Sequence, residues 1–166
     1  MQLALGTVQF GLEYGIAGRG AVVPEVEVKA ILARAADLGI RVLDTASVYG
    51  DIETRLASLA DMSQFQVISK IRPKPLDLTE AGLRAWVASE VSRSCDRFGA
   101  AMYGLMFHRA DDLLEECGGA LWEACEAATA GKNLKLGVSC YDLKTLQEVQ
   151  ARFPVAIAQV PGNAFD

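Results

Sequence analysis

The segment RVLDTASVYG, from Arg41 to Gly50, joins a buried strand to two side chains with acid–base chemistry. Its apolar pair Val42-Leu43 is typical of the body of a strand, and Gly50 closes a turn. Asp44 and Tyr49, an acid and a phenol, lie where the strand runs out into a loop. In a barrel of parallel strands, catalytic groups lie at this carboxyl end. The first question is therefore whether other strands end in matching side chains.

Apolar strands and amphipathic helices alternate along the rest of the chain. Short apolar runs predict strands over residues 3–10, 42–43, 65–71, 103–108, 134–139 and 155–160. Helical spacing of apolar residues predicts helices over 24–38, 52–59, 79–98, 113–130 and 143–153. The candidate helix-starting residues are Pro24, Thr79, Asp111 and Asp112. Gly6 interrupts the first strand and indicates either a bulge or the close approach of a ligand.

This alternation is typical of a parallel sheet with helical crossovers. Two architectures share it, a barrel and an open doubly wound sheet. The open sheet should show a glycine-rich phosphate loop of the GxGxxG type after its first strand. The glycines of the loop expected over residues 11–21 do not form that pattern, which favours the barrel. We therefore expect a single α/β barrel domain over residues 1–166.

Composition excludes several classes of function. The 166 residues are 51% hydrophobic and 22% charged, and their formal net charge is −5 with no basic run. We therefore expect no nucleic acid and no membrane as partner, and a cytoplasmic location. With His108 as the only histidine, a multi-histidine metal site within one chain is impossible, and we expect no metal. The four cysteines, Cys95, Cys117, Cys125 and Cys140, form no CxxC pair and are expected to be buried free thiols.

Polar residues recur at the ends of the predicted strands. After Asp44 and Tyr49 on the second strand come Lys70 on the third, His108 on the fourth, Ser139 on the fifth and Gln159 on the sixth. In a parallel barrel these side chains converge on one face. A phenol with an ordinary pKa near 10 becomes a usable proton donor beside an ammonium, and a carboxylate can hold that ammonium in place. Such a group would protonate a carbonyl oxygen as hydride reaches the carbonyl carbon.

Several segments together resemble the aldo-keto reductases. They are Leu5-Gly6-Thr7, GIRVLDTASVYGDIE over residues 39–53, ISKI over 68–71, LMFH over 105–108, Gly137-Val138-Ser139 and QVPGN over 159–163. The resemblance covers the chain from end to end. It implies an eight-stranded α/β barrel that uses NADPH, without a Rossmann domain, to reduce aldehydes and ketones to alcohols.

The resemblance also implies a role for each strand-end residue. Tyr49 would be the general acid, Lys70 would lower its pKa, and Asp44 would pair with Lys70. His108 would orient the carbonyl oxygen through a hydrogen bond. The positions that match cofactor-binding positions of the family are Ser139 and Gln159 for the nicotinamide carboxamide, and Gly6, Thr7 and Asp44 near the cofactor.

Two departures from the family pattern stand out. Cys140 follows Ser139 where the family usually has Asn, which removes one amide hydrogen bond to the nicotinamide. The chain also ends after the sixth predicted strand, whereas such a barrel typically needs about 250 residues. We therefore expect a partial (β/α)8 barrel with about six of its eight strands, as a fragment, as a natural truncation that pairs with another copy, or as a rearranged compact fold. Open edges at the first and sixth strands predict self-association.

Each candidate residue also has a structural interpretation. Taken alone, Asp44 could cap a loop, Tyr49 could be a half-buried aromatic residue, and Lys70 could be a surface lysine. A lone histidine such as His108 is more often structural than catalytic, and Ser139 or Gln159 could satisfy backbone groups. Asp51 and Glu53 follow a turn and are expected to be solvated.

Two classes of function therefore remain. The first is NADPH-dependent reduction of a small carbonyl substrate, with Tyr49 as the proton donor. The second is a non-catalytic barrel, a relic or a regulatory or interaction module, that no longer holds a cofactor. Cys140 and the missing strands favour the second class, and the intact set of strand-end residues favours the first.

Overall fold

The computed structural model describes residues 2–15 and 20–162. The chain divides into two compact units. The first unit comprises residues 1–69 and 94–103, and the second unit comprises residues 70–93 and 104–166. Gly18 of the expected glycine-rich loop and Asn163 of the last family segment lie outside the described residues.

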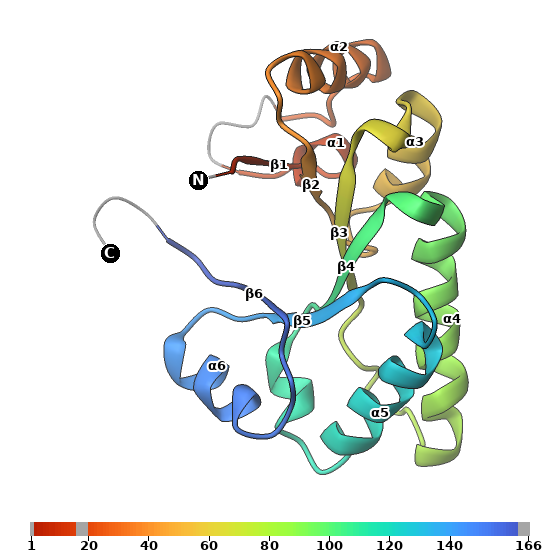
Figure 1. The fold of residues 1–166 in the computed structure, drawn as a ribbon, viewed down its shortest axis with the longest axis vertical. Helices are drawn as coiled ribbons and strands as arrows, with labels where there is room; N and C mark the ends of the chain where they lie inside the picture. Colours follow the sequence, from red (N-terminus) through yellow and green to blue (C-terminus); the bar gives the residue numbers. More distant parts are fainter. Residues whose placement is uncertain (1, 16–19, 163–166) are drawn as a thin grey trace. The chain divides into compact units, whose positions relative to one another are not determined.

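Six strands follow one another in the sheet in the order of the sequence (Figure 1). They are β1 (Ala4–Gly6), β2 (Val42–Asp44), β3 (Gln66–Ile71), β4 (Met102–Phe107), β5 (Lys135–Ser139) and β6 (Ile157–Gln159). β1 pairs with β2, β2 with β3, β4 with β5, and β5 with β6, and each of these pairs is parallel. The prediction of an α/β fold built from parallel βα repeats is confirmed.

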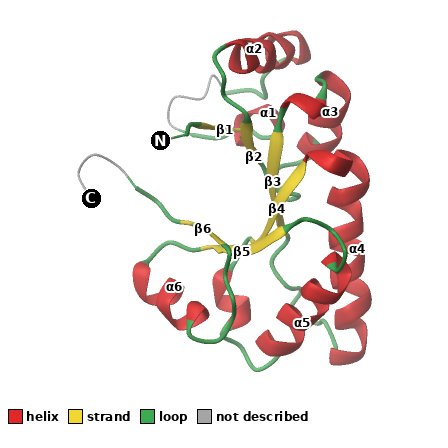
Figure 2. Ribbon diagram, in the orientation of Figure 1, coloured by secondary structure: helices red, strands yellow, loops and turns green. Residues whose placement is uncertain are grey.

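At least one helix follows each of the first five strands (Figure 2). The α-helices are α1 (Val8–Gly11), α2 (Glu25–Asp37), α3 (Ile52–Leu59), α4 (Glu80–Phe98), α5 (Gly118–Thr129) and α6 (Leu143–Gln150). Short 3-10 turns are η1 (Met62–Gln64), η2 (Gly99–Ala101) and η3 (Ala110–Leu113). None of the helices in the described part of the chain is both long enough and apolar enough to cross a membrane.

In the first unit, apolar positions at helical spacing bury one face of each long helix. Pro24 precedes α2 at its N-cap, where a missing backbone N–H costs nothing, and Val28, Leu32 and Ala35 are buried along the helix. In α3, Ile52 and Leu56 are fully buried one turn apart. The predicted bounds of α3 are confirmed, and those predicted for α2 are within one residue.

The predicted strand over residues 3–10 is wrong beyond Gly6. β1 ends there, and Val8 begins the one-turn helix α1. The chain turns at Thr7, whose ψ is 3°, and the backbone N–H of Phe10 then donates to the carbonyl oxygen of Thr7. A short apolar run fits a buried strand and a buried helical turn equally well, so periodicity alone did not separate them.

In the second unit, an aromatic stack fills the space between β4 and α5. Trp122 of α5 stacks on Phe107 with a centroid distance of 6.0 Å and on Phe153 with a distance of 5.1 Å. The interpretation of Trp122 as a packing residue is confirmed.

The predicted helix over residues 113–130 is divided in the structure. Residues up to Leu113 form the 3-10 turn η3, and α5 begins only at Gly118. Asp111 and Asp112 therefore do not cap α5, and the prediction of those caps is wrong. The Asp112 carboxylate instead accepts a hydrogen bond from the backbone N–H of Lys74 at 2.8 Å.

β5 and β6 approach each other closely at Gly137. An added Cβ at Gly137 would lie 1.8 Å from the carbonyl oxygen of Ile157, which is far inside van der Waals contact. These two residues are paired in the parallel register. The glycine is therefore required for β6 to pair at its observed distance.

We predict that Gly137→Ala destabilises the chain by about 1–3 kcal/mol or more, because β6 must move away from β5. The matched control is Gly119→Ala in α5, where no described atom lies within 4 Å of the added methyl group and alanine favours the helix. Thermal unfolding of the two variants measures the difference, at about 2–4 °C per kcal/mol for a chain of this size. Equal melting temperatures would contradict the close strand approach.

Candidate functional site

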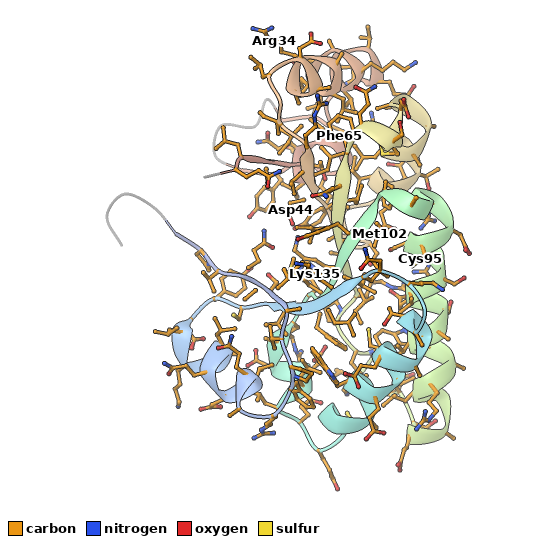
Figure 3. The ribbon with its side chains drawn as sticks, viewed as in Figure 1. Arg34, Asp44, Phe65, Cys95, Met102 and Lys135 are labelled. Atoms are coloured by element: carbon orange, nitrogen blue, oxygen red, sulfur yellow. The ribbon has the colours of Figure 1, made fainter. Side chains whose placement is uncertain are left out.

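The structure places the predicted site residues at strand ends in both units. Gly6, Thr7, Asp44 and Tyr49 belong to the first unit, and Lys70, His108, Ser139 and Gln159 belong to the second. Asp44, labelled in Figure 3, is the last residue of β2, and Ser139 and Gln159 are the last residues of β5 and β6. Lys70 lies next to the end of β3, and His108 directly follows β4.

Thr7 fixes the end of β1 to the end of β2. Its backbone N–H and its Oγ1 hydroxyl both donate to the carbonyl oxygen of Asp44, at 3.0 and 2.9 Å. The Thr7 side chain is buried, so its hydroxyl has a structural role here. β2 is extended on its other edge, where the N–H of Thr45 donates to the carbonyl oxygen of Ile68. Asp44 is thereby held between two neighbouring strands while its side chain is half-buried.

Gly6 lies in a regular part of the strand ladder. It pairs with Asp44, in the same register that joins Ala4 to Val42 and Leu5 to Leu43. The alternative of a bulge at Gly6 is therefore wrong. No described atom lies within 4 Å of the place where a Cβ on Gly6 would stand. The space beside Gly6 is open, and its use by a ligand remains a prediction.

The turn that carries Tyr49 packs directly on α1. A Cβ on Gly11 would lie 1.9 Å from the carbonyl oxygen of Tyr49, and a Cβ on Gly50 would lie 2.8 Å from the carbonyl oxygen of Gly11. Gly50 also has a φ of +67°, which side chains disfavour. The predicted glycine turn is confirmed. The two glycines allow the Tyr49 backbone to approach α1 as closely as it does.

Arg55 anchors the helix that follows this turn. Its guanidinium donates to the backbone carbonyl oxygen of Phe10 and, at 2.9 Å, to that of Val23. These carbonyls belong to α1 and to the segment before α2, so Arg55 joins three parts of the first unit. No pattern in the sequence indicates this role for Arg55.

Glu53 is buried, and the prediction that it is solvated is wrong. Its Oε1 accepts hydrogen bonds from the hydroxyls of Ser69 at 2.5 Å and Ser94 at 2.7 Å. Its Oε2 accepts from Nη1 of Arg97 at 3.0 Å. The side chain is only 4% exposed. The carboxylate thus connects α3 to β3 and to the C-terminal part of α4.

A sequence signal for this network does exist. Ser94 occupies a position in the apolar stripe of α4 that runs through Val87, Val91 and Phe98. A polar residue on the buried face of a helix needs a buried partner. Glu90 occupies the same face and carries the same signal.

In the second unit, Lys70 is buried near the end of β3. Only 1% of the residue is exposed, so the interpretation of Lys70 as a surface lysine is wrong. Lysine is almost never fully buried unless its ammonium is paired.

Glu90 of α4 holds Arg72, two residues beyond Lys70. Arg72 Nη2 lies 2.5 Å from Glu90 Oε1, and Arg93 Nη1 lies 2.7 Å from the same oxygen. Burial raises the pKa of Glu90, but the hydrogen bonds from Arg72 and the charges of the two arginines outweigh it, so the net shift is downward. Glu90 therefore remains ionised and fixes the backbone where β3 ends.

Three other site residues follow neighbouring strands. The N–H of His108 donates to the carbonyl oxygen of Ile71 at 3.3 Å, which continues the ladder from β3. β4 and β5 pair up to Phe107 and Val138, and β5 and β6 pair up to Ser139 and Gln159. The structure therefore brings His108, Ser139 and Gln159 together at one edge of the second unit.

Ser139 and Gln159 have the chemistry that a carboxamide needs. Both are half-buried, and within the described part of the chain neither side chain has a hydrogen-bond partner. Together they offer a hydroxyl and an amide, which can donate and accept at the same time.

The Cys140 thiol lies against the backbone carbonyl oxygen of Gln159. Its backbone N–H donates to the carbonyl oxygen of Gln159 at 3.0 Å, and its Sγ lies 3.9 Å from the same oxygen. Burial, with the nearby charges of Asp142 and Asp111, raises the pKa of the thiol, which is therefore neutral at pH 7. Cys125 and Cys140 are buried as predicted, whereas Cys95 and Cys117 are half-buried, and all four are free thiols.

Asp112 joins the loops that follow β3 and β4. It accepts from the N–H of Lys74 at 2.8 Å, and its Oδ1 lies 2.7 Å from Nε of Arg109. Burial raises the pKa of this carboxyl, although Lys74 and Arg109 oppose the shift. The segment immediately after His108 is thus tied to the exit of β3.

We predict that Glu90 makes stability depend on pH on the acid side. Because its pKa is lowered on folding, its contribution is present above the ordinary value of 4.5 and is lost as the pH falls through the lower folded value. Glu90→Gln should cost about 2 kcal/mol at pH 7, less than a fully buried pair because Arg72 is 45% exposed. Urea unfolding at several pH values should show the wild type and this variant converging below pH 4.5.

The control for this prediction is Glu148→Gln. Glu148 lies 3.8 Å from Lys144 in an exposed pair on α6, which contributes little at any pH. A gap between wild type and Glu90→Gln that stays constant down to pH 3 would contradict the assignment.

Three proteins of known structure that resemble this chain are all described as aldo-keto reductases. A candidate aldo-keto reductase from Pseudomonas aeruginosa superposes with a TM-score of 0.75 at 25% identity, over 98% of this chain and 64% of that one. A second structure described in the same way, from the same organism, gives 0.74 at 25% identity, over 98% and 63%. An aldo/keto reductase from Brucella melitensis gives 0.61 at 16% identity, over 96% and 57%, and shows the likeness of fold alone. The chain thus spans less than two thirds of the length of these proteins.

These likenesses confirm the fold class, a partial (β/α)8 barrel. No curated protein matches the chain. The family model of the aldo/keto reductases, however, matches residues 2–166, which is almost the entire sequence. The chain therefore belongs to the aldo/keto reductase family.

Proposed function

We propose that this chain carries the catalytic residues of a nicotinamide-dependent carbonyl reductase, with Tyr49 as general acid. The observation that carries the proposal is the burial of Lys70, which is 1% exposed and belongs to the family segment ISKI of β3. A buried ammonium needs a nearby negative or hydrogen-bonding group, and it lowers the pKa of a phenol placed beside it. Family membership supports the same conclusion, as do the positions of Asp44 at the end of β2, Tyr49 in the turn that follows and His108 directly after β4.

In the proposed reaction the cofactor supplies a hydride to the carbonyl carbon. Tyr49 donates its phenolic proton to the carbonyl oxygen, and the product is an alcohol. Lys70 stabilises the phenolate that remains, and Asp44 compensates the lysine charge. His108 donates a hydrogen bond that orients the carbonyl oxygen before the proton is transferred. The phenolate then recovers a proton from solvent.

We assign the nicotinamide carboxamide to Ser139 and Gln159. The two residues are paired in the strand register, and both are half-buried. Thr7 supports the end of β1 through its two bonds to Asp44. The expectation of NADPH rather than NADH rests on the family resemblance.

A second candidate function is a non-catalytic barrel module. The observation in its favour is Cys140, whose buried neutral thiol faces the Gln159 carbonyl where the family usually offers an amide. Loss of that amide would weaken the hold on the nicotinamide. Cofactor binding separates the two candidates directly.

We predict that Tyr49→Phe lowers the rate of NADPH-dependent aldehyde reduction by about 10²–10⁴-fold while the dissociation constant for NADPH changes little. The proton donor is lost, but the shape of the aromatic ring is kept. Tyr14→Phe is the matched control, since Tyr14 is an exposed tyrosine of the same unit. Stopped-flow absorbance measures the rate, and an active Tyr49→Phe protein would reject Tyr49 as general acid.

We also predict saturable binding of NADPH that depends on Gln159. Titration of the chain should quench its tryptophan emission, and Gln159→Ala should weaken binding about tenfold through the loss of its hydrogen bonds to the carboxamide. Gln147→Ala, at an exposed position on α6, is the control. A folded protein that shows no binding at millimolar NADPH would favour the non-catalytic module.

A further inference from the structure

Glu53 is a buried charge that the proposed reaction does not use. It belongs to the family segment that contains Asp44 and Tyr49, and it lies in the first turn of α3, four residues after Tyr49. Moving a carboxylate out of water is costly, and a buried ion pair is a poor source of stability. We therefore ask which elements the buried Glu53 carboxylate holds in position.

Three donors surround this carboxylate, and they come from two other elements. Ser69 of β3 and Ser94 of α4 share Oε1, at 2.5 and 2.7 Å, and Arg97 of α4 binds Oε2 at 3.0 Å. Hydrogen bonds to an ionised acceptor are stronger than neutral ones and hold a narrower range of geometry. All of these residues lie in the first unit.

Ser69 connects the network to β3, the strand that also contains Lys70. Ser69 directly precedes Lys70 in β3, and Glu53 follows the Tyr49 turn at the start of α3. The other side of the turn is already fixed, because Gly11 and Gly50 bring it against α1 and Arg55 anchors α3 to the same part of the chain. The Glu53 carboxylate joins the start of α3 to β3, because it accepts the hydrogen bond from Ser69.

We propose that Glu53 is a positioning residue whose carboxylate, through Ser69, fixes the start of α3, and with it the Tyr49 turn, to β3. This inference rests on the proposed function, in which Tyr49 donates the proton and Lys70 stabilises the phenolate. Displacement of a catalytic group by about 1 Å can cost up to 100-fold in rate. Glu53 thus contributes to catalysis without contacting substrate or cofactor.

The test compares Ser69→Ala with Ser94→Ala in the full chain. Both serines are fully buried, and both donate to the same oxygen of Glu53, but only Ser69 lies on β3. Each variant keeps the Glu53 charge, so a direct electrostatic effect on Tyr49 is the same in both. The readout is the titration of Tyr49 by NMR of chain labelled with ¹³C at tyrosine Cζ, with the Tyr49 signal identified by its absence in Tyr49→Phe.

We expect Ser69→Ala to raise the pKa of Tyr49 by about half a unit or more, because in the proposed function the Lys70 ammonium lowers that pKa and a displaced turn weakens this effect. Ser94→Ala should move it by less than half of that amount. Where turnover is measurable, Ser69→Ala should lower kcat about tenfold with an unchanged NADPH dissociation constant. Val28→Ala, which removes buried volume from α2 in the same unit, is the control for loss of stability and should leave the Tyr49 titration unchanged.

Glu53→Ala separates position from charge by the sign of its effect. Removal of a negative charge alone would lower the pKa of Tyr49, whereas displacement from Lys70 raises it. A raised pKa in Glu53→Ala and Ser69→Ala supports the inference even in a chain that shows no reductase activity, in which case only the proposed function fails. A Tyr49 titration that is identical in wild type and Ser69→Ala overturns the inference, even if Tyr49→Phe confirms the general acid.

Discussion

Parallel pairing at the ends of the strands is the constraint on which the positions of the site residues depend. In the first unit, the carbonyl oxygen of Asp44 accepts two hydrogen bonds from Thr7, and Thr45 continues the ladder to Ile68. In the second unit, Ser139 and Gln159 are paired at the ends of β5 and β6. Because parallel strands run in one direction, every carboxyl end in a unit lies at the same edge. Residues far apart in the sequence become neighbours at that edge.

In each unit, buried carboxylates fix segments that lie outside the strand ladder. Glu53 holds the start of α3, Glu90 holds the exit of β3, and Asp112 ties that exit to the loop after β4. Each carboxylate has at least one arginine partner and one backbone or hydroxyl donor. Such satisfied networks specify one geometry, even where they add little to the free energy of unfolding. These hydrogen-bonded carboxylates therefore lie near the segments that carry the proposed catalytic residues, whose positions must be fixed.

Much of the fold could be predicted from the sequence, because local patterns encode it. The helical spacing of Val28, Leu32 and Ala35, with Pro24 before them, is enough to predict α2. β3 is predicted by its apolar run, which turn residues bound. The boundary at Thr7 could not be predicted, since two hydrogen bonds to a residue 37 positions away decide it. The burial of Glu53 could not be predicted for the same reason, because its partners Ser94 and Arg97 lie 41 and 44 residues further along the chain. The candidate site residues were predicted from polar residues at strand ends and from the family resemblance. Neither of these predicts the buried carboxylates Glu53, Glu90 and Asp112.

The central proposal is that Tyr49 is a general acid whose pKa is lowered by the Lys70 ammonium. The measurement that tests it most directly is the titration of the Tyr49 phenol in the wild type and in Lys70→Met, whose side chain has a similar length and no charge. We predict that the pKa of Tyr49 lies below that of an ordinary tyrosine in the wild type and rises measurably when the ammonium is removed. The same pKa in both proteins, with the fold of each verified by near-UV circular dichroism, would contradict it.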